Sequence, residues 1–310
     1  MTDRGMHKVV LIKRRTRYEE LKKRYNTVEQ ARFYIEHLGA DFSDYEAEHA
    51  AYQNALETVR AAVRPLARVQ EIEREYVPNM IFGENDIVIA LGQDGLVANA
   101  MKYLTTQALI GVNPDPARFD GVLLPFETHD VALAVQNVIK GTFSAKEIAM
   151  GKAQSTDGQV LYAVNDFFAG VKNHTSARYS LHYRGEIEAQ SSSGVIVSTP
   201  FGMTGWHKSV MAQFSAMARA FGLGEVREKK ADWGEKKLTF QVREPYPSRY
   251  TKATLVYGEV GSGETLRLTS SMSENGVLFS DGIEQDAIEF NAGATITITP
   301  ADRTGILVTR

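Results

Sequence analysis

The sequence contains no cysteine, so disulfide bonds and thiolate metal ligands are excluded outright. It also lacks any apolar run near the roughly 20 residues that a membrane-spanning helix needs. The first ten residues, MTDRGMHKVV, lack the apolar core of a secretion signal. We therefore expect no membrane partner, and we take the cytoplasm as the default location.

A large excess of charge of either sign is also missing. The chain has 35 lysines and arginines against 38 aspartates and glutamates, a net charge of −3. A protein that binds by neutralising a nucleic-acid backbone carries a clear basic excess, so we expect no nucleic-acid partner. The seven histidines show no metal-ligand spacing with a carboxylate, so we predict no protein-bound metal site. The 310 residues, 43% apolar and 24% charged, are typical of a globular protein with room for two domains.

A short apolar strand followed by a glycine turn organises the first half of the chain. Residues 86–91 (DIVIAL) end on Gly92, Gly95 follows, and a helix is predicted over 97–104. A strand, a glycine turn and a helix start present backbone N–H groups to anions. Asp94 stands between the glycines, where it suits a group that accepts a proton from a substrate hydroxyl. The alternative is a tight turn in which Asp94 only bonds the backbone.

Strands and helices alternate in this half, which predicts a parallel sheet. The expected strands are residues 8–13, 67–73, 86–91 and 108–112, and the expected helices are residues 17–36, 45–63, 97–104 and 128–140. Two long helices before the glycine turn are more than a βαβ unit needs. We interpret them as an insertion that serves an interface.

The second half is rich in strands and contains one helix, predicted over 208–221. The expected strands are residues 145–155, 159–169, 177–188, 194–199, 237–242, 252–260, 264–270, 277–280, 287–290, 294–299 and 305–309. Asp157-Gly158 and Arg184-Gly185 are typical of hairpin turns. We therefore predict an α/β domain over residues 1–141 and a β-sandwich domain over residues 142–310. As an alternative, the C-terminal end of the second domain packs back on the first domain.

Two further segments of the second half carry chemistry. Asn165 and Asp166 end an apolar strand, and their amide and carboxylate groups suit sugar hydroxyls or an adenine amino group. A hydrogen-bonded turn is the alternative. Residues 191–206 place small and hydroxyl-bearing residues around a β-branched strand, then a proline and glycines before a helix. This is a second strand–glycine–helix junction, or a hairpin with a helix cap.

These segments, in this order and at these intervals, resemble the NAD kinase family. Residues 92–96 (GQDGL) look like its G-G-D-G-T motif, and residues 110–113 (IGVN) look like the strand end that follows. Residues 163–166 (AVND) are similar to its A-L-N-E motif, and residues 195–202 (VIVSTPFG) to its S-T-P-T/S-G turn. Residues 280–282 (SDG) stand where the family has a late D-G turn. The resemblance spans about residues 8 to 310.

The resemblance implies a Rossmann-like N-terminal domain, a C-terminal β-sandwich, and NAD bound between them. It implies transfer of the γ-phosphoryl group of ATP to the adenosine-ribose 2′-hydroxyl of NAD, with Mg²⁺, in a homodimer or higher homo-oligomer. Asp94 would be the catalytic base. By motif position the nucleotide-binding residues would be Gly92, Gly95, Asn165, Asp166, Thr204 and Gly205. The helices after the first strand, and residues 242–245 (VREP), look most like the mitochondrial-type branch.

Four residues depart from the family pattern. Gln93 replaces a glycine, Leu96 replaces a threonine, and Phe201 and Met203 replace hydroxyl-bearing residues. A side chain at Gln93 is expected to crowd a triphosphate or to resist a positive φ angle. These departures favour a second hypothesis, a catalytically silent NAD(P)- or nucleotide-binding relative. A third hypothesis keeps the fold with a lipid or sugar acceptor, although no basic amphipathic stretch indicates membrane docking.

Overall fold

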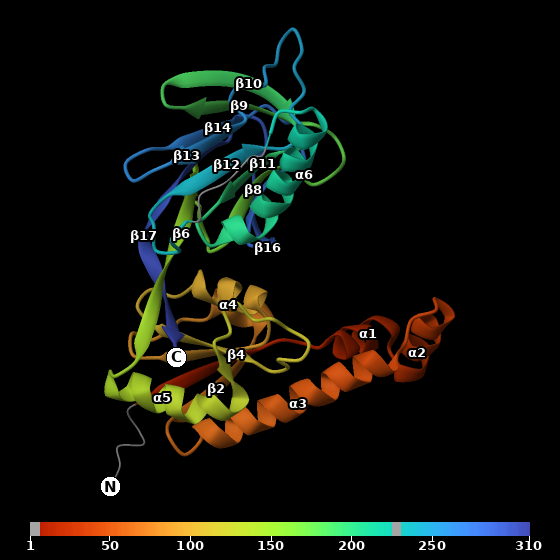
Figure 1. Cartoon of the computed structure of the whole chain (residues 1–310), viewed down its shortest axis with the longest axis vertical. Helices are drawn as coiled ribbons and strands as arrows, with labels where there is room; N and C mark the ends of the chain where they lie inside the picture. The colour runs from red at the N-terminus through yellow and green to blue at the C-terminus, as the bar shows by residue number, and fades with distance from the viewer. Residues whose placement is uncertain (1–6, 225–230) are drawn as a thin grey trace. The chain divides into compact units, whose positions relative to one another are not determined.

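The computed structural model describes residues 7–224 and 231–310. These residues form two compact units, shown in Figure 1. The α/β unit comprises the described residues up to Lys146 together with Ile306–Arg310, and the β unit comprises the described residues of Glu147–Gly305. The boundary between residues 141 and 142 that the sequence suggests stays a prediction. No helix within the described ranges has the length and apolar character needed to cross a membrane.

The α/β unit is built on a parallel sheet. Its elements are β1 (Lys8–Lys13), α1 (Arg17–Tyr25), α2 (Val28–His37), α3 (Ser43–Val63), β2 (Arg68–Glu73), the 3₁₀ helix η1 (Arg74–Asn79), β3 (Ile87–Leu91), α4 (Asp94–Met101), β4 (Ala108–Asn113), β5 (Phe126–Glu127), the 3₁₀ helix η2 (Thr128–Asp130), α5 (Val131–Lys140) and the last residues of β17 (Thr295–Thr309). The strand order is β17-β4-β3-β1-β2, with β5 also on β4. Every pairing among these strands is parallel, so the predicted parallel sheet is confirmed.

The apolar strands explain this sheet, because a parallel sheet is covered on both faces. All five residues of β3 are buried, as are the four central residues of β1. Helices α3 and α5 contribute Leu56, Val59 and Val135 to the core that covers one face. The smaller helices α1 and α2 lie beside α3 (Figure 1) and share a separate small core around Phe42.

The prediction of one helix over residues 17–36 is wrong, because the chain breaks at Asn26. That residue adopts a φ of 63°, outside the helical region. Thr27 then caps α2, since its side-chain oxygen accepts the N–H of Gln30 at 3.1 Å. The helix predicted over 97–104 begins three residues earlier, at Asp94 itself.

The β unit consists of antiparallel strands and one long helix. Its elements are β6 (Ser144–Ser155), β7 (Val160–Ala163), β8 (Asp166–Val171), β9 (Ala177–Tyr183), β10 (Glu186–Ser192), β11 (Val195–Ser198), the 3₁₀ helix η3 (Gly202–Thr204), α6 (Trp206–Ala220), β12 (Leu238–Val242), β13 (Tyr257–Val260), β14 (Leu266–Ser270), β15 (Gly276–Ser280), β16 (Ile283–Glu289) and most of β17. One sheet has the order β13-β12-β11-β8-β15-β16. The other has the order β10-β9-β14-β17, with the hairpin β6–β7 on β17.

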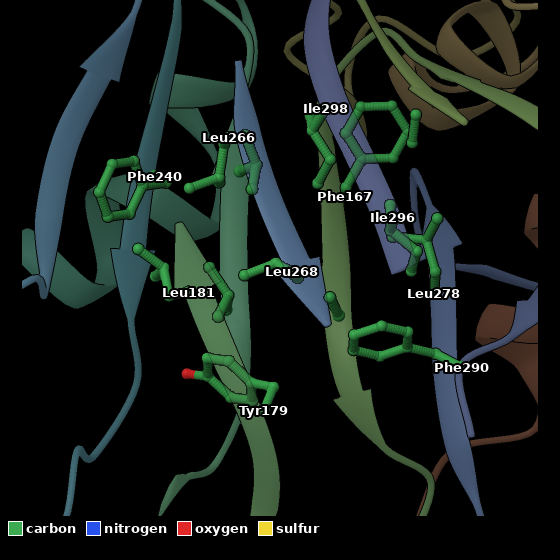
Figure 2. Close-up of a cluster of buried hydrophobic side chains, with 14 of the residues drawn as sticks. Phe167, Tyr179, Leu181, Phe240, Leu266, Leu268, Leu278, Phe290, Ile296 and Ile298 are labelled. Atoms are coloured by element: carbon green, nitrogen blue, oxygen red, sulfur yellow. The ribbon is translucent and has the colours of Figure 1, made fainter. Parts of the chain in front are cut away.

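The two sheets of this unit enclose one hydrophobic core, so the predicted sandwich is confirmed. Figure 2 shows side chains of both sheets in it, among them Phe167 and Phe240 of the six-stranded sheet and Leu181 of the other. On the outer face of the six-stranded sheet, Trp206 of α6 stacks on Phe168 with 5.5 Å between ring centroids. Helix α6 is therefore the single helix that was predicted for this half of the chain.

Two of the strand predictions differ from the observed strands in where the strands begin and end. The strand expected over 159–169 is interrupted at residues 164 and 165, where β7 ends and β8 has not begun. The strands expected over 294–299 and 305–309 form the single strand β17. Its first part pairs with β14 in the β unit, and Ile306 and Leu307 pair with β4 in the α/β unit.

Candidate functional site

The glycine turn lies at the carboxyl end of β3, and a tyrosine of α3 fixes it there. The hydroxyl of Tyr52 accepts the N–H of Arg14 at 2.9 Å and donates to the carbonyl of Leu91 at 3.0 Å. Gly92 follows, and its N–H donates to the carbonyl of Val112 on β4 at 3.1 Å. The ends of β1, β3 and β4 are thereby held together at one edge of the sheet. The sequence analysis did not predict this role for Tyr52.

Asp94 is the first residue of α4 and is half-buried. Its Oδ1 accepts the N–H of Leu123 at 2.7 Å, and its Oδ2 accepts the N–H of Val122 at 3.1 Å. The carboxylate thus bonds the backbone, as the tight-turn alternative expects. A carboxylate has about four acceptor positions, so two remain after these bonds. Asp94 is therefore both fixed in orientation and able to accept a substrate hydroxyl.

The loop that supplies those two N–H groups is itself anchored. The side chain of Asn113 donates to the carbonyl of Phe119 at 2.9 Å and accepts the N–H of Asp115 at 3.0 Å. Arg118 pairs with Asp44 at the start of α3 at 2.6 Å. The backbone of this loop also lies close to β4, since a Cβ added at Gly111 would stand 2.0 Å from the carbonyl oxygen of Leu123. These contacts keep the donors of the Asp94 carboxylate in place.

Gly95 is open to a ligand. A Cβ added there meets no atom within 4 Å, and the residue lies in the first turn of α4. Neither packing nor a positive φ angle requires a glycine at this position. A bare backbone at a helix N-terminus is the feature that allows an anion to approach closely.

The change Gly95→Ala is therefore expected to leave the fold intact and to weaken nucleotide binding. Alanine is the better helix former by about 0.5–1 kcal/mol, so the melting temperature should stay constant or rise. The added methyl group occupies the space of an approaching phosphate, and the Kd for ATP measured by calorimetry should rise. Gly202→Ala is the contrasting variant, because its Cβ would stand 1.8 Å from a backbone oxygen and should unfold the β unit. An unchanged ATP affinity in Gly95→Ala would show that no ligand approaches this turn.

Among the residues that depart from the family pattern, Leu96 and Phe201 are buried and Gln93 is exposed. Gln93 has a φ of −106° and an exposed side chain, so the expected positive φ angle is wrong. Leu96 is buried next to Gly92, where a Cβ on the glycine would stand 2.8 Å from Leu96 Cδ2. Phe201 packs edge-on against Trp233, with 4.9 Å between ring centroids. Leu96 and Phe201 thus replace hydroxyl groups with apolar packing.

In the β unit, one carboxylate organises the turn between β7 and β8. The side chain of Asp281 accepts the N–H groups of Val164 at 3.0 Å, Asn165 at 2.7 Å and Asp166 at 3.2 Å. In return, the N–H of Asp281 donates to the carbonyl of Asp166 at 2.9 Å. The late D-G turn of the sequence and the segment of Asn165 and Asp166 are therefore one structural feature.

The second strand–glycine–helix junction joins the same feature. The N–H of Thr199 donates to the carbonyl of Asn165 at 2.9 Å, and its hydroxyl donates to the carbonyl of Val164. The N–H of Gly202 donates to the Thr199 hydroxyl at 3.1 Å. A Cβ at Gly202 would stand 1.8 Å from the carbonyl oxygen of Asn165, so this close approach needs a glycine. Segments far apart in the sequence thus meet around Asn165 and Asp166.

Asp166 is the most unusual titratable group of the cluster. Its side chain is 7% exposed and has no ion pair or side-chain hydrogen bond within the described ranges. Burial, and then the charge of Asp281, raise the pKa of Asp166 from 3.8 to about 7. A buried carboxyl group without a compensating partner costs free energy, and such groups cluster at functional sites. Asp166 is therefore a candidate ligand-binding group with unused acceptor positions.

The two remaining predicted residues stay within their own turn. The hydroxyl of Thr204 donates to the carbonyl of Phe201 at 2.9 Å, and the N–H of Gly205 donates to the carbonyl of Gly202 at 2.9 Å. Both residues are exposed. The side chain of Thr204 is not drawn into the cluster around Asp166, although its turn starts from Gly202.

The described residues provide no metal cage. No group of three or more histidine, aspartate or glutamate side chains in residues 7–224 and 231–310 is placed to hold a metal ion. Mg²⁺ that is bound through a nucleotide usually has one or two protein carboxylates and several waters. Such a site needs fewer protein ligands than a metal cage does.

Comparisons with known proteins show the fold. No protein-family model matches the sequence, and no curated protein matches it. The structure is similar to that of an NAD kinase from Archaeoglobus fulgidus in complex with ATP, with a TM-score of 0.57 and 14% identity over 97% of this chain and 93% of that one. It is also similar to a yeast NADH kinase complexed with NADH, with a TM-score of 0.57 and 15% identity over 98% of this chain and 83% of that one. The chain therefore has an NAD kinase-like fold.

Proposed function

We propose that this protein is an NAD kinase of the mitochondrial-type branch, which transfers the γ-phosphoryl group of ATP to the adenosine-ribose 2′-hydroxyl of NAD. The observation that carries the proposal is Asp94, an oriented carboxylate with free acceptor positions at a glycine turn. The fold supports it, since one solved neighbour is an NAD kinase bound to ATP and another an NADH kinase bound to NADH.

In the proposed reaction, Asp94 accepts the hydrogen of the ribose 2′-hydroxyl. A sugar hydroxyl is a poor nucleophile at neutral pH, and a positioned carboxylate orients it and takes its proton. The 2′-oxygen forms a bond to the γ-phosphorus while the bond from that phosphorus to the β,γ-bridging oxygen breaks. ADP leaves, and Asp94 releases the proton to solvent. The N–H groups of Val122 and Leu123 hold the carboxylate in place during this transfer.

The other proposed site residues bind and orient the nucleotides. The backbone at Gly92 and Gly95 would line the phosphates, because anions are favoured at a helix N-terminus. Asn165 offers an amide, and Asp166 offers a carboxyl group whose acceptor positions are unused, to hydroxyl or amino groups of the nucleotide. Thr204 and Gly205 would contact the nicotinamide half.

The direct test is incubation with ATP, Mg²⁺ and NAD, with the NADP that forms read out by an NADP-specific dehydrogenase. We expect time-dependent formation of the phosphorylated dinucleotide that requires ATP. Failure to form it, together with a rise in melting temperature on adding NAD, would instead identify a silent nucleotide-binding relative. Product formed only from a lipid or sugar acceptor would identify a kinase of another specificity.

The proposal includes assembly into a homodimer or higher homo-oligomer. It is supported by exposed apolar side chains on α6, where Phe214 is 54% and Met217 is 51% exposed. Light scattering of the purified protein measures the assembly directly.

A further inference from the structure

A cavity of about 520 Å³ lies at the carboxyl end of β1. Side chains of β1, α1, α3 and β2 line it, and most of the charged ones are cationic. The cations are Lys13, Arg14, Arg15, Lys22, Lys23 and Arg60. Only Glu19 and Glu73 are acidic among the lining residues. A second cavity of about 440 Å³ shares Arg14 and Arg15 with it and adds two more arginines.

The cations differ in whether they are already neutralised. Arg14 pairs with Glu48 at 2.9 Å, and Arg60 pairs with Glu71 at 2.6 Å. Carboxylates therefore compensate much of the arginine charge. Lys22 and Lys23 are both exposed on α1. Within the described ranges, no carboxylate lies within ion-pair distance of either lysine. The charge of these two lysines is available to an incoming anion.

The cavity borders the glycine turn that precedes Asp94. Tyr52, one of its lining residues, donates to the carbonyl of Leu91 at 3.0 Å, one residue before Gly92. Arg14 lines the cavity, and its Cδ would stand 3.6 Å from a Cβ added at Gly92. Ligands of parallel α/β sheets bind outside the carboxyl ends of the strands, where this cavity lies. An anion held in it can extend along the turn.

We propose that this cavity binds the polyphosphate chain of the phosphoryl donor, and that Lys22 and Lys23 of α1 determine its affinity. This inference rests on the proposed function for the role of the donor. A chain of three phosphates carries several negative charges, which suits a cavity with an uncompensated basic wall. The helical insertion after β1 then supplies part of the donor site.

The test compares the wild-type chain with the double variant Lys22→Gln/Lys23→Gln. Calorimetry measures the Kd for ATP and for inorganic tripolyphosphate, and the coupled assay measures KM for ATP and for NAD. We expect both Kd values and KM for ATP to rise about tenfold, since two exposed charge contacts are lost. KM for NAD should change by less than about twofold, because the lysines contact only the donor.

The control is Lys140→Gln/Lys172→Gln, which removes two charges from exposed positions on α5 and in the loop after β8. Its affinities should match those of the wild type. Equal Kd values in the wild type and the Lys22/Lys23 variant overturn the inference, as does failure of the wild type to bind either polyphosphate. Lysine-dependent binding of tripolyphosphate by a protein that forms no NADP supports the cavity and contradicts the proposed function alone.

Discussion

Replacing Asp94 with asparagine should lower kcat for NADP formation by about 10²- to 10⁴-fold, the contribution typical of a positioned general base. The asparagine side chain keeps the shape of the aspartate but accepts no proton from the ribose hydroxyl. Its oxygen still accepts the N–H of Leu123, whereas its amide nitrogen cannot accept the N–H of Val122. The coupled assay at saturating ATP and NAD measures the loss.

The same variant separates catalysis from structure. The bond from the Val122 N–H is exposed, so water replaces it and its loss costs about 0.5–1.5 kcal/mol. The melting temperature should therefore fall by a few degrees while the protein stays folded at the assay temperature. Asp115→Asn is a matched control, because that carboxylate lies in the same anchored loop and pairs with Arg118. It should retain most of the activity. If Asp94→Asn turns over at a rate close to the wild type, Asp94 only holds the loop.

Replacing Asp166 with asparagine should stabilise the protein at alkaline pH and weaken its binding of NAD. The rise of the Asp166 pKa from 3.8 to about 7 means that ionising this group destabilises the native state. The stabilising contribution of the protonated group is fully present below about pH 4 and is lost as the pH rises through about 7. At pH 8 the full effect corresponds to at most about 4 kcal/mol, which the neutral asparagine should recover.

Urea denaturation between pH 5 and pH 8 measures this difference, and calorimetry measures the Kd for NAD. The stability gain of Asp166→Asn should grow across that window. Asp281→Asn is the opposite control, because its carboxylate accepts three N–H groups and its loss should destabilise the β unit. A gain that does not vary with pH would show that Asp166 is not buried as an unpaired carboxyl group.

Local patterns predicted the sheet and the glycine turn, because their signals lie within a few consecutive residues. The apolar run of β1 and the glycine-flanked Asp94 are of this kind. The break at Asn26 was missed because a single residue with a positive φ angle interrupts an otherwise helical pattern. The break between β7 and β8 was missed because the carboxylate of Asp281, distant in the sequence, organises it.

The sequence predicted which residues belong to the candidate site better than it predicted the interactions between them. Local sequence and the resemblance to the NAD kinase family singled out Asp94, Asn165 and Asp166, whereas the partners of these residues depend on tertiary contacts. Nothing in a pattern of letters shows that Leu123 donates to Asp94 or that Asp166 has no cation beside it. The basic cavity was missed for the same reason, since its cations come from β1 and the loop after it, from α1 and from α3.

The long strand β17 has a consequence for the order in which the protein is made. Ile306 and Leu307 of β17 pair in parallel with Ala108 and Leu109 of β4. A ribosome completes β1 to β4 well before it reaches these residues, and the β unit is translated in the interval. Until then, water must satisfy the backbone groups of β4 that later pair with β17. The nascent α/β unit thus acquires its last backbone pairing only after the whole β unit has been synthesised.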